Sequence, residues 1–175
     1  MDPVRESQDV TSEAYHGTKE HIAGEIIKNG FCLPPVGSPE GRYGRAVYFW
    51  LNSKDQAVWW AKKTCNRGDV IAVIRAKAAY GRHLNIVSWD GQKLLAKVAR
   101  NLAVATSAQT VTEAAALNFM AHKGWIETAL VLDFPEQTPV KVFTGSYSVQ
   151  GPRLILCVYR VEKILERTIV LTEAA

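Results

Sequence analysis

The sequence has few cysteines, no long apolar run and no strong excess of one charge. Its 175 residues contain three cysteines, Cys32, Cys65 and Cys157, at wide spacing and without a C-x-x-C pair. An odd, unpatterned set argues against a disulfide framework and a zinc knuckle, so we expect three reduced thiols. No segment reaches the roughly 20 apolar residues of a membrane-spanning helix, and the polar N-terminus lacks the core of a signal peptide. These absences predict a cytoplasmic protein without a membrane partner.

Other absences narrow the chemistry. The sequence has no G-x-G-x-x-G motif and no regular alternation of strands and helices, which argues against a Rossmann domain. The histidines have no partners at metal-ligand spacing, so we expect no metal site. A net charge of +4 permits a phosphate-rich partner without requiring one. Length and composition predict one globular domain over 1–175, with a flexible leader over 1–12.

Hydrophobic patterning at helical spacing predicts several helices. A first helix is expected over 18–29, where Asn-Gly ends the pattern. A second helix begins near Ser53, which is spaced with Gln56 as a capping box. The segment 88–124 predicts two helices joined near 107–110, and no function is assigned to them.

Apolar and alternating runs predict strands between these helices. Together they indicate an α+β fold, because strands and helices do not alternate regularly. The Pro- and Gly-rich segment 31–45 is expected to be a long loop of the kind that often binds ligands. The expected strands cover 46–50, 69–77, 128–134, 139–145 and 153–164.

Two short motifs carry the strongest functional signal. "YHGT" places His16 and Gly17 at the end of a short strand, with Thr18 as the expected cap of the first helix. "GRYGRAVYFW" then places Tyr48 inside an apolar strand, followed by a helix with two adjacent tryptophans. Taken separately, a histidine beside a helix start and a tyrosine in a strand both have ordinary structural explanations. Their order and spacing are more informative.

Together these motifs resemble the ADP-ribosyltransferase fold, in the branch shared by diphtheria-type toxins and the poly- and mono-ADP-ribosyl polymerases. That branch has His-Gly at the end of its first strand, an amphipathic helix ending near Gly-Phe, a loop, an aromatic strand and a helix with alanine and an aromatic residue. The same order occurs here over about 14–61. The resemblance implies a split β-sheet sandwich with inserted helices, NAD as co-substrate, and transfer of a single ADP-ribose.

The resemblance also implies roles for individual residues. His16 would hydrogen-bond the ribose of the adenosine half of NAD, and the backbone of Gly17 would bind the nicotinamide carboxamide. Tyr48 would stack on one side of the cationic nicotinamide ring, and Trp59 or Trp60 on the other. Such cation–π stacking contributes about 0.5–2 kcal/mol.

The third catalytic position departs from the family pattern. Alignment with the final family strand places Ile155 where glutamate or glutamine is usual, and isoleucine can neither accept a hydrogen bond nor orient a nucleophile. We favour transfer of one unit to an acceptor that supplies its own base. Two alternatives stay open: a slipped alignment in which Gln150, Glu162 or another polar residue fills the role, and a site that binds NAD without turnover. Extension into poly(ADP-ribose) is disfavoured because it needs the missing carboxylate.

The acceptor is the least determined part of this interpretation. Arg42 and Arg45 flank the glycine-rich loop and are candidates to contact a pyrophosphate or an acceptor phosphate, although solvated loop arginines are an equal explanation. Basic charge with interleaved aromatic residues favours RNA or DNA over protein. A compact transferase domain resembles stand-alone toxins of toxin–antitoxin or phage-defence systems, which would add a neutralising antitoxin as a partner. Protein modification, NAD hydrolysis and a silent NAD-binding domain are the alternatives.

Overall fold

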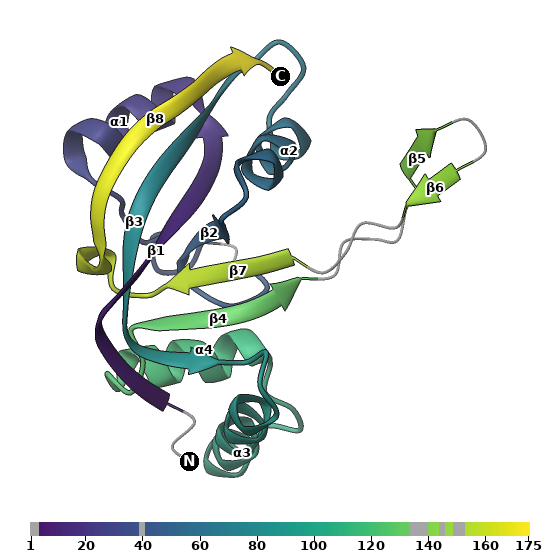
Figure 1. The fold of residues 1–175 in the computed structure, drawn as a ribbon. Coiled ribbons are helices and arrows are strands. Elements are labelled where there is room, and N and C mark those ends of the chain that lie inside the picture. Colours follow the sequence, from purple (N-terminus) through teal and green to yellow (C-terminus); the bar gives the residue numbers. More distant parts are fainter. Residues whose placement is uncertain (1–3, 39–40, 134–139, 144–145, 149–152) are drawn as a thin grey trace.

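The computed structural model describes residues 4–38, 41–133, 140–143, 146–148 and 153–175 (Figure 1). They form a mixed α+β structure whose strands are mostly antiparallel, as expected. The elements are β1 (Val4–Lys19), α1 (Glu20–Asn29), β2 (Val47–Leu51), α2 (Lys54–Thr64), β3 (Val70–Asn85), α3 (Trp89–Thr106), α4 (Glu113–His122), β4 (Thr128–Asp133), β5 (Val140–Phe143), β6 (Ser146–Ser148), β7 (Arg153–Val158), the 3₁₀ helix η1 (Val161–Lys163) and β8 (Ile164–Ala174).

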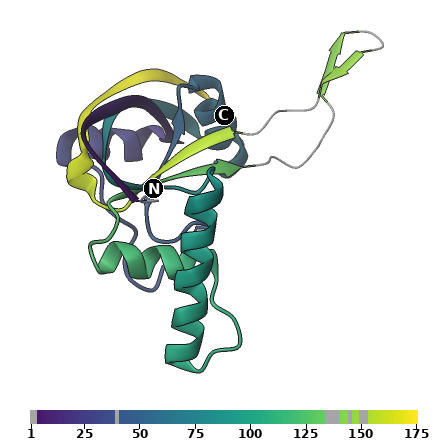
Figure 2. The same cartoon turned by 60° about the horizontal axis from the view of Figure 1, so that its bottom comes forward.

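The main sheet has six strands and curls back on itself. Its strand order is β1-β2-β7-β4-β3-β8. Because β1 also pairs with β3, the strands β1, β2, β7, β4 and β3 form a closed ring. Within this sheet β3 and β4 run parallel, whereas the other described pairs are antiparallel. Figure 2 shows the curl of the strands, with α3 and α4 projecting on one side. β5 and β6 form a separate two-stranded sheet.

The two helices predicted within 88–124 are confirmed as α3 and α4. The Ser88 side chain caps α3 by accepting a hydrogen bond from the Gly91 amide at 3.2 Å. Ser107 ends this helix in the left-handed conformation, with a φ of 55°. The Thr112 side chain caps α4 through the Ala115 amide at 3.1 Å. Among the described residues, no helix has the length and apolar character needed to cross a membrane.

The expected starts of the first two helices are wrong. Thr18 does not cap α1, because it pairs with Ala72 of β3 and stays extended, and the N-cap is Lys19 without a side-chain bond. Ser53 is the N-cap of α2, but its side chain makes no capping hydrogen bond. Gln56, the other half of the expected capping box, instead has a buried side-chain oxygen without a hydrogen-bond partner among the described residues.

Two strands extend the sheet beyond the prediction at its N- and C-terminal ends. Residues 4–12, expected to be a flexible leader, begin β1, which pairs with β3 from Val4 onward. At the other end, the expected strand 153–164 stops at Val158, and the unpredicted strand β8 pairs with the opposite edge of β3. Both additions use β3, which lies between the first and last strands of the chain (Figure 1).

The core divides into two clusters on opposite faces of β2. Alternation along this strand points Trp50 into one cluster, which also holds Ile155 of β7, and Phe49 into the other. Tyr48 is partly buried and packs against the Trp50 cluster. The Phe49 cluster contains Phe31, which follows α1. The alternation of side chains along β2 therefore decides on which side of the sheet each aromatic residue lies.

Candidate functional site

The first part of the candidate site is the point where the pairing between β1 and β2 ends. Their ladder pairs Tyr15 with Trp50, and among the described strands no pair follows it. Continued by two residues, this register would set Gly17 opposite Tyr48. The Nδ1 atom of His16 lies 3.0 Å from the Tyr48 backbone oxygen at this point. The structure thus brings three of the expected site residues together.

The environment of His16 fixes its protonation. A carbonyl oxygen can only accept, so Nδ1 donates to Tyr48 and Nε2 remains the acceptor of the ring. The imidazole packs edge-on against Phe31, with centroids 5.3 Å apart, and lies 5.8 Å from Phe49. Burial lowers the pKa of His16, and the hydrogen bond to Tyr48 offsets this only in part. The ring is therefore neutral at physiological pH.

Gly17 allows α2 to pack directly on β1. A Cβ atom at this position would lie 2.0 Å from the backbone oxygen of Ala57 and 3.0 Å from the Cβ atom of Ala61. Any side chain would therefore push the helix away from the strand. This contact fixes the position of the helix that carries Trp59 and Trp60.

Two tyrosine hydroxyls hold the glycine-rich loop against β2. The Tyr48 hydroxyl donates to the Gly44 carbonyl at 2.5 Å and accepts from the Tyr43 amide at 3.2 Å. The Tyr159 hydroxyl donates to the Tyr43 carbonyl at 2.7 Å, and burial raises its pKa so that it keeps its proton. Gly41 lies so close that a Cβ atom there would be 2.5 Å from the Tyr48 hydroxyl. The loop expected to bind ligands is thus anchored on Tyr48.

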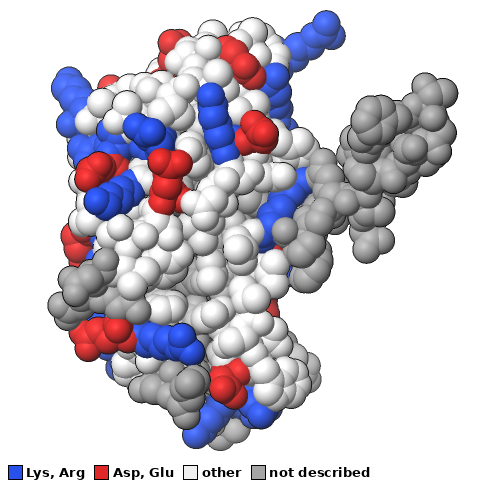
Figure 3. All heavy atoms as spheres, in the orientation of Figure 1, with Lys and Arg blue, Asp and Glu red and all other residues white. Residues whose placement is uncertain are grey.

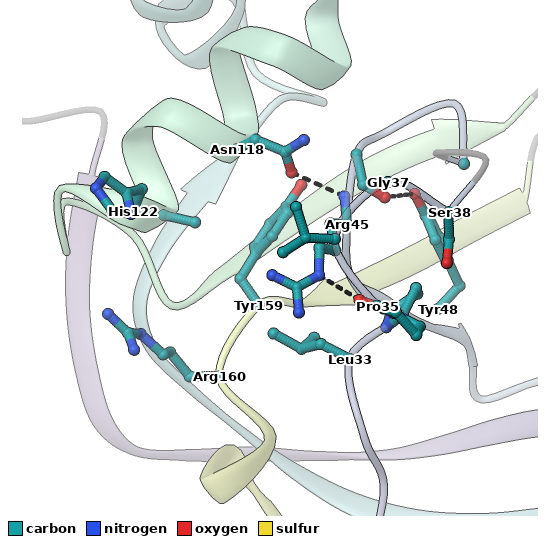
Figure 4. Close-up of a pocket in the computed structure, with 15 residues that line it drawn as sticks. Leu33, Pro35, Gly37, Ser38, Arg45, Tyr48, Asn118, His122, Tyr159 and Arg160 are labelled. Carbon is teal, nitrogen blue, oxygen red and sulfur yellow. Dashed lines mark hydrogen bonds between the residues drawn. The ribbon is translucent and has the colours of Figure 1, made fainter.

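The anchored loop and α4 enclose a cavity of about 370 Å³ beside Tyr48 (Figure 4). The Arg45 amide donates to the Asn118 side-chain oxygen at 2.7 Å, and the Arg45 Nε atom donates to the Pro34 carbonyl. Arg160 and His122 complete the polar part of the wall (Figure 4). The volume lies in the range of small-molecule sites, and the arginines favour an anionic group.

Trp59 and Trp60 belong to a different aromatic cluster from Tyr48. The ring centroids of Trp59 and Trp60 are 6.2 Å apart, and Trp60 lies 6.2 Å from Trp50. The ring contact described for Tyr48 is with Tyr43, at 6.5 Å. Residues of α2 do not line the cavity beside Tyr48. The expected sandwich of a strand tyrosine and a helix tryptophan around the nicotinamide ring stays a prediction.

Arg153 is a residue of this aromatic cluster that the sequence reasoning missed. It begins β7, is 5% exposed, and points to the same side of the strand as Ile155. Its guanidinium carbon lies 4.2 Å from the Trp59 ring centroid and 5.8 Å from that of Trp50. Its three guanidinium nitrogens have no hydrogen-bond partner among the described residues. The sequence did hold one signal for its position: residues two apart in a strand lie on the same side, so Arg153 was predictable as a neighbour of Ile155.

Ile155, the residue expected at the third catalytic position, lies in an apolar environment. Ile155 is buried between β2 and β4, with Trp50 and Val131 as its cross-strand neighbours. Glu162, one proposed substitute, is exposed in η1. Gln150, the other, lies outside the described residues. The described chain thus gives no direct support for either substitute.

Arg42 lies outside the cavity beside Tyr48. Its Nη1 atom lies 3.4 Å from a carboxylate oxygen of Asp133, and its guanidinium is 5.4 Å from the Tyr43 ring. It lines a second cavity of about 410 Å³, bounded by α3 and β4. Arg45 and Arg42, both candidates to contact a phosphate, therefore line different cavities.

The sequence matches no protein-family model and none of the curated proteins. Within the described residues, no group of three or more His, Cys, Asp or Glu side chains is placed to hold a metal ion. The site is therefore characterised by its side-chain geometry.

Proposed function

We propose that the protein is an NAD-dependent mono-ADP-ribosyltransferase with an ADP-ribosyltransferase-like split sheet. The observation that carries this proposal is the neutral His16, placed with Gly17 and Tyr48 where β1 and β2 stop pairing. A neutral imidazole offers Nε2 to a ribose hydroxyl, and it does not repel the positive charge of the nicotinamide ring. Among the residues named by the family resemblance, these three lie at one point of the sheet, where the His16 ring contacts the Tyr48 backbone.

The aromatic cluster supports recognition of a planar cation. Trp59 already stacks against such a group, the guanidinium of Arg153 at 4.2 Å. Lys63 also lies over this ring, with its Nζ atom 5.0 Å from the centroid, and its side chain is exposed. In the proposal, Trp59 of α2 contributes one face of the nicotinamide site and Tyr48 of β2 contributes the other.

The proposed reaction needs positioning more than covalent catalysis. The bond between the ribose C1′ and the nicotinamide nitrogen breaks, its electron pair leaves with neutral nicotinamide, and an acceptor oxygen or nitrogen bonds to C1′. The acceptor proton must pass to a basic group. Because Ile155 cannot take it, we expect the acceptor itself or solvent to receive the proton.

A nucleic acid acceptor is favoured over protein. Trp60 is 42% exposed on α2 and can stack on an unpaired base, which is a common mode of single-strand recognition. Figure 3 shows basic and acidic side chains interspersed on the face it displays, so we expect local contacts to guide binding. A role as a toxin or phage-defence effector is part of the proposal through the family resemblance.

A labelled-donor assay tests this function. The protein is incubated with NAD labelled in the adenylate phosphate, alone or with RNA, single-stranded DNA or a protein mixture. Label on nucleic acid supports the proposal, and label on polypeptide supports a protein-modifying transferase. Free ADP-ribose without a labelled macromolecule indicates hydrolysis, and intact NAD in every reaction contradicts an enzymatic role.

Matched variants connect the reaction to the site. Tyr48→Ala removes the stacking ring and should abolish turnover, whereas Tyr48→Phe keeps the ring and should retain it. His16→Ala should mainly raise the Kd for NAD, with His21→Ala on the exposed face of α1 as its control. Full activity in both Tyr48→Ala and His16→Ala would show that the assigned roles are wrong.

A further inference from the structure

The guanidinium of Arg153 is buried without a hydrogen-bond acceptor. The side chain is 5% exposed, and its Nε, Nη1 and Nη2 atoms all lack a partner among the described residues. Burial lowers the pKa of Arg153, as expected for a cation removed from water, but a guanidinium remains charged in proteins. A buried cation without an acceptor is costly, so such a group calls for an anion that completes it.

The guanidinium lies between two tryptophan rings that offer it no hydrogen-bond acceptor. Its central carbon is 4.2 Å from the Trp59 ring centroid and 5.8 Å from that of Trp50. A cation–π contact uses the charge of the guanidinium and does not satisfy its five N–H donors. The fork that these donors form matches two oxygens of a phosphate group.

The charges around Arg153 also favour an anion. Asp133 lies directly across the β4–β7 ladder from Arg153, but its ion pair is with Arg42 at 3.4 Å. Lys63 adds a further positive charge on the Trp59 ring. Among the described residues named here, three are cations and one is a carboxylate, whose charge acts on Arg153 as well as on Arg42.

We propose that Arg153 anchors a phosphate-binding site formed with Trp59 and Lys63. Its ligand is either the diphosphate of the dinucleotide or a phosphodiester of the acceptor strand. This inference rests on the proposed function, because it assigns one of the two substrates to a specific residue. Arg153 lies two residues from Ile155 on the same side of β7, so the phosphate is held beside the apolar third position.

Binding measurements by calorimetry test the site with three probes: inorganic pyrophosphate, NAD and a short oligouridylate. Arg153→Met should weaken at least one of these complexes about 10- to 100-fold, because a hydrogen-bonded charged group is lost. Arg153→Lys keeps the charge without the fork and should give an intermediate loss. The control Arg75→Met removes an exposed arginine of β3 that pairs with Glu13 of β1. It should change the affinity for each probe less than about 2-fold.

The pattern across probes identifies the source of the phosphate. Losses for pyrophosphate and NAD assign the site to the donor, and a loss for oligouridylate alone assigns it to the acceptor. Thermal unfolding gives an independent readout, because the bound probe should raise the Tm of the wild type and not that of Arg153→Met. If Arg153→Met does not fold, Arg153→Lys carries the test.

Unchanged affinity of the folded Arg153 variants for all three probes would overturn the phosphate site. A Tm lowered in both variants with unchanged affinity would likewise assign Arg153 a structural role. These outcomes are separate from the transferase assay. Phosphate binding that depends on Arg153, without ADP-ribose transfer, would support this inference and contradict the proposed function. ADP-ribose transfer without phosphate binding at Arg153 would support the proposed function and contradict this inference.

Discussion

The Nδ1 atom of His16 and the backbone oxygen of Tyr48 lie 3.0 Å apart, just beyond the last pair between β1 and β2. One side chain therefore bridges two strands where their backbones no longer bond. The same contact fixes the tautomer and leaves Nε2 as the acceptor. In the proposed function, this acceptor atom is the one that would bind the ribose hydroxyl.

Stability should fall as the pH drops below neutrality. Burial lowers the pKa of both His16 and His83, so the unfolded state, with a histidine pKa of about 6.5, binds more protons below that pH. The histidine contribution is complete above pH 6.5 and is lost towards the lower folded-state pKa values. Each group can contribute a slope of up to about 1.4 kcal/mol per pH unit.

Urea unfolding between pH 7.5 and 5.5 measures this effect. His16→Asn keeps a donor for the Tyr48 carbonyl but does not titrate, so its stability should depend less on pH. His83→Asn serves as the comparison, since the pKa of His83 is also affected by the charge of Arg5. An unchanged pH slope in His16→Asn would contradict a neutral, buried His16.

Gly17→Ala should destabilise the protein by about 1–3 kcal/mol or more, because the new Cβ would lie 2.0 Å from the Ala57 backbone oxygen. Gly24→Ala is the matched control in α1. It meets no atom within 4 Å and should stabilise the helix by about 0.5–1 kcal/mol. Chemical denaturation of the two variants should give opposite signs, and equal effects would show that α2 does not pack tightly on β1.

Tyr48→Phe should loosen the glycine-rich loop while keeping the ring. The variant loses the hydroxyl that bonds the Gly44 carbonyl and the Tyr43 amide, with an expected cost of about 0.5–1.5 kcal/mol per bond. Hydrogen exchange of the amides in 41–46 should accelerate relative to those of β3. Unchanged exchange in this segment would mean that the Tyr159 hydroxyl anchors the loop alone.

The three free cysteines should react with thiol reagents in a defined order. Cys32 is exposed, Cys65 is half-buried, and Cys157 is fully buried, where burial raises the pKa of its thiol. Mass spectrometry after brief alkylation of the native protein should find Cys32 modified most and Cys157 unmodified. Early labelling of Cys157 would indicate that β7 opens readily from the sheet.

The sequence predicted the elements whose local pattern and packing agree. The helices α3 and α4 were predictable because their periodicity and the joint after Ser107 point the same way. Thr18 failed as a cap because a non-local partner, Ala72 of β3, holds it in a ladder. β8 was missed for a similar reason, since its charged residues conceal an edge strand that only pairing with β3 reveals.

The candidate site was predictable at its centre and less so at its edges. His16, Gly17 and Tyr48 meet because strand register brings their motifs together. The position of Trp59 depends on the packing of α2, and the buried guanidinium of Arg153 depends on the side of β7 that faces this helix. Neither contact follows from a local pattern. Because side chains alternate along a strand, the sequence could have predicted that Arg153 lies on the same side of β7 as Ile155. It could not have predicted that the guanidinium lacks a hydrogen-bond acceptor.

The last strand has a consequence for self-association. β8 covers one edge of β3, whose segment 71–74 is entirely apolar and inaccessible to solvent. A chain cut before Ile164 would present this segment as an open template for strands of other molecules. In this chain, β8 covers that edge and carries the charged residues Glu166 and Glu173, and charges on an edge strand discourage such pairing. The C-terminal strand thus acts as a built-in guard against aggregation.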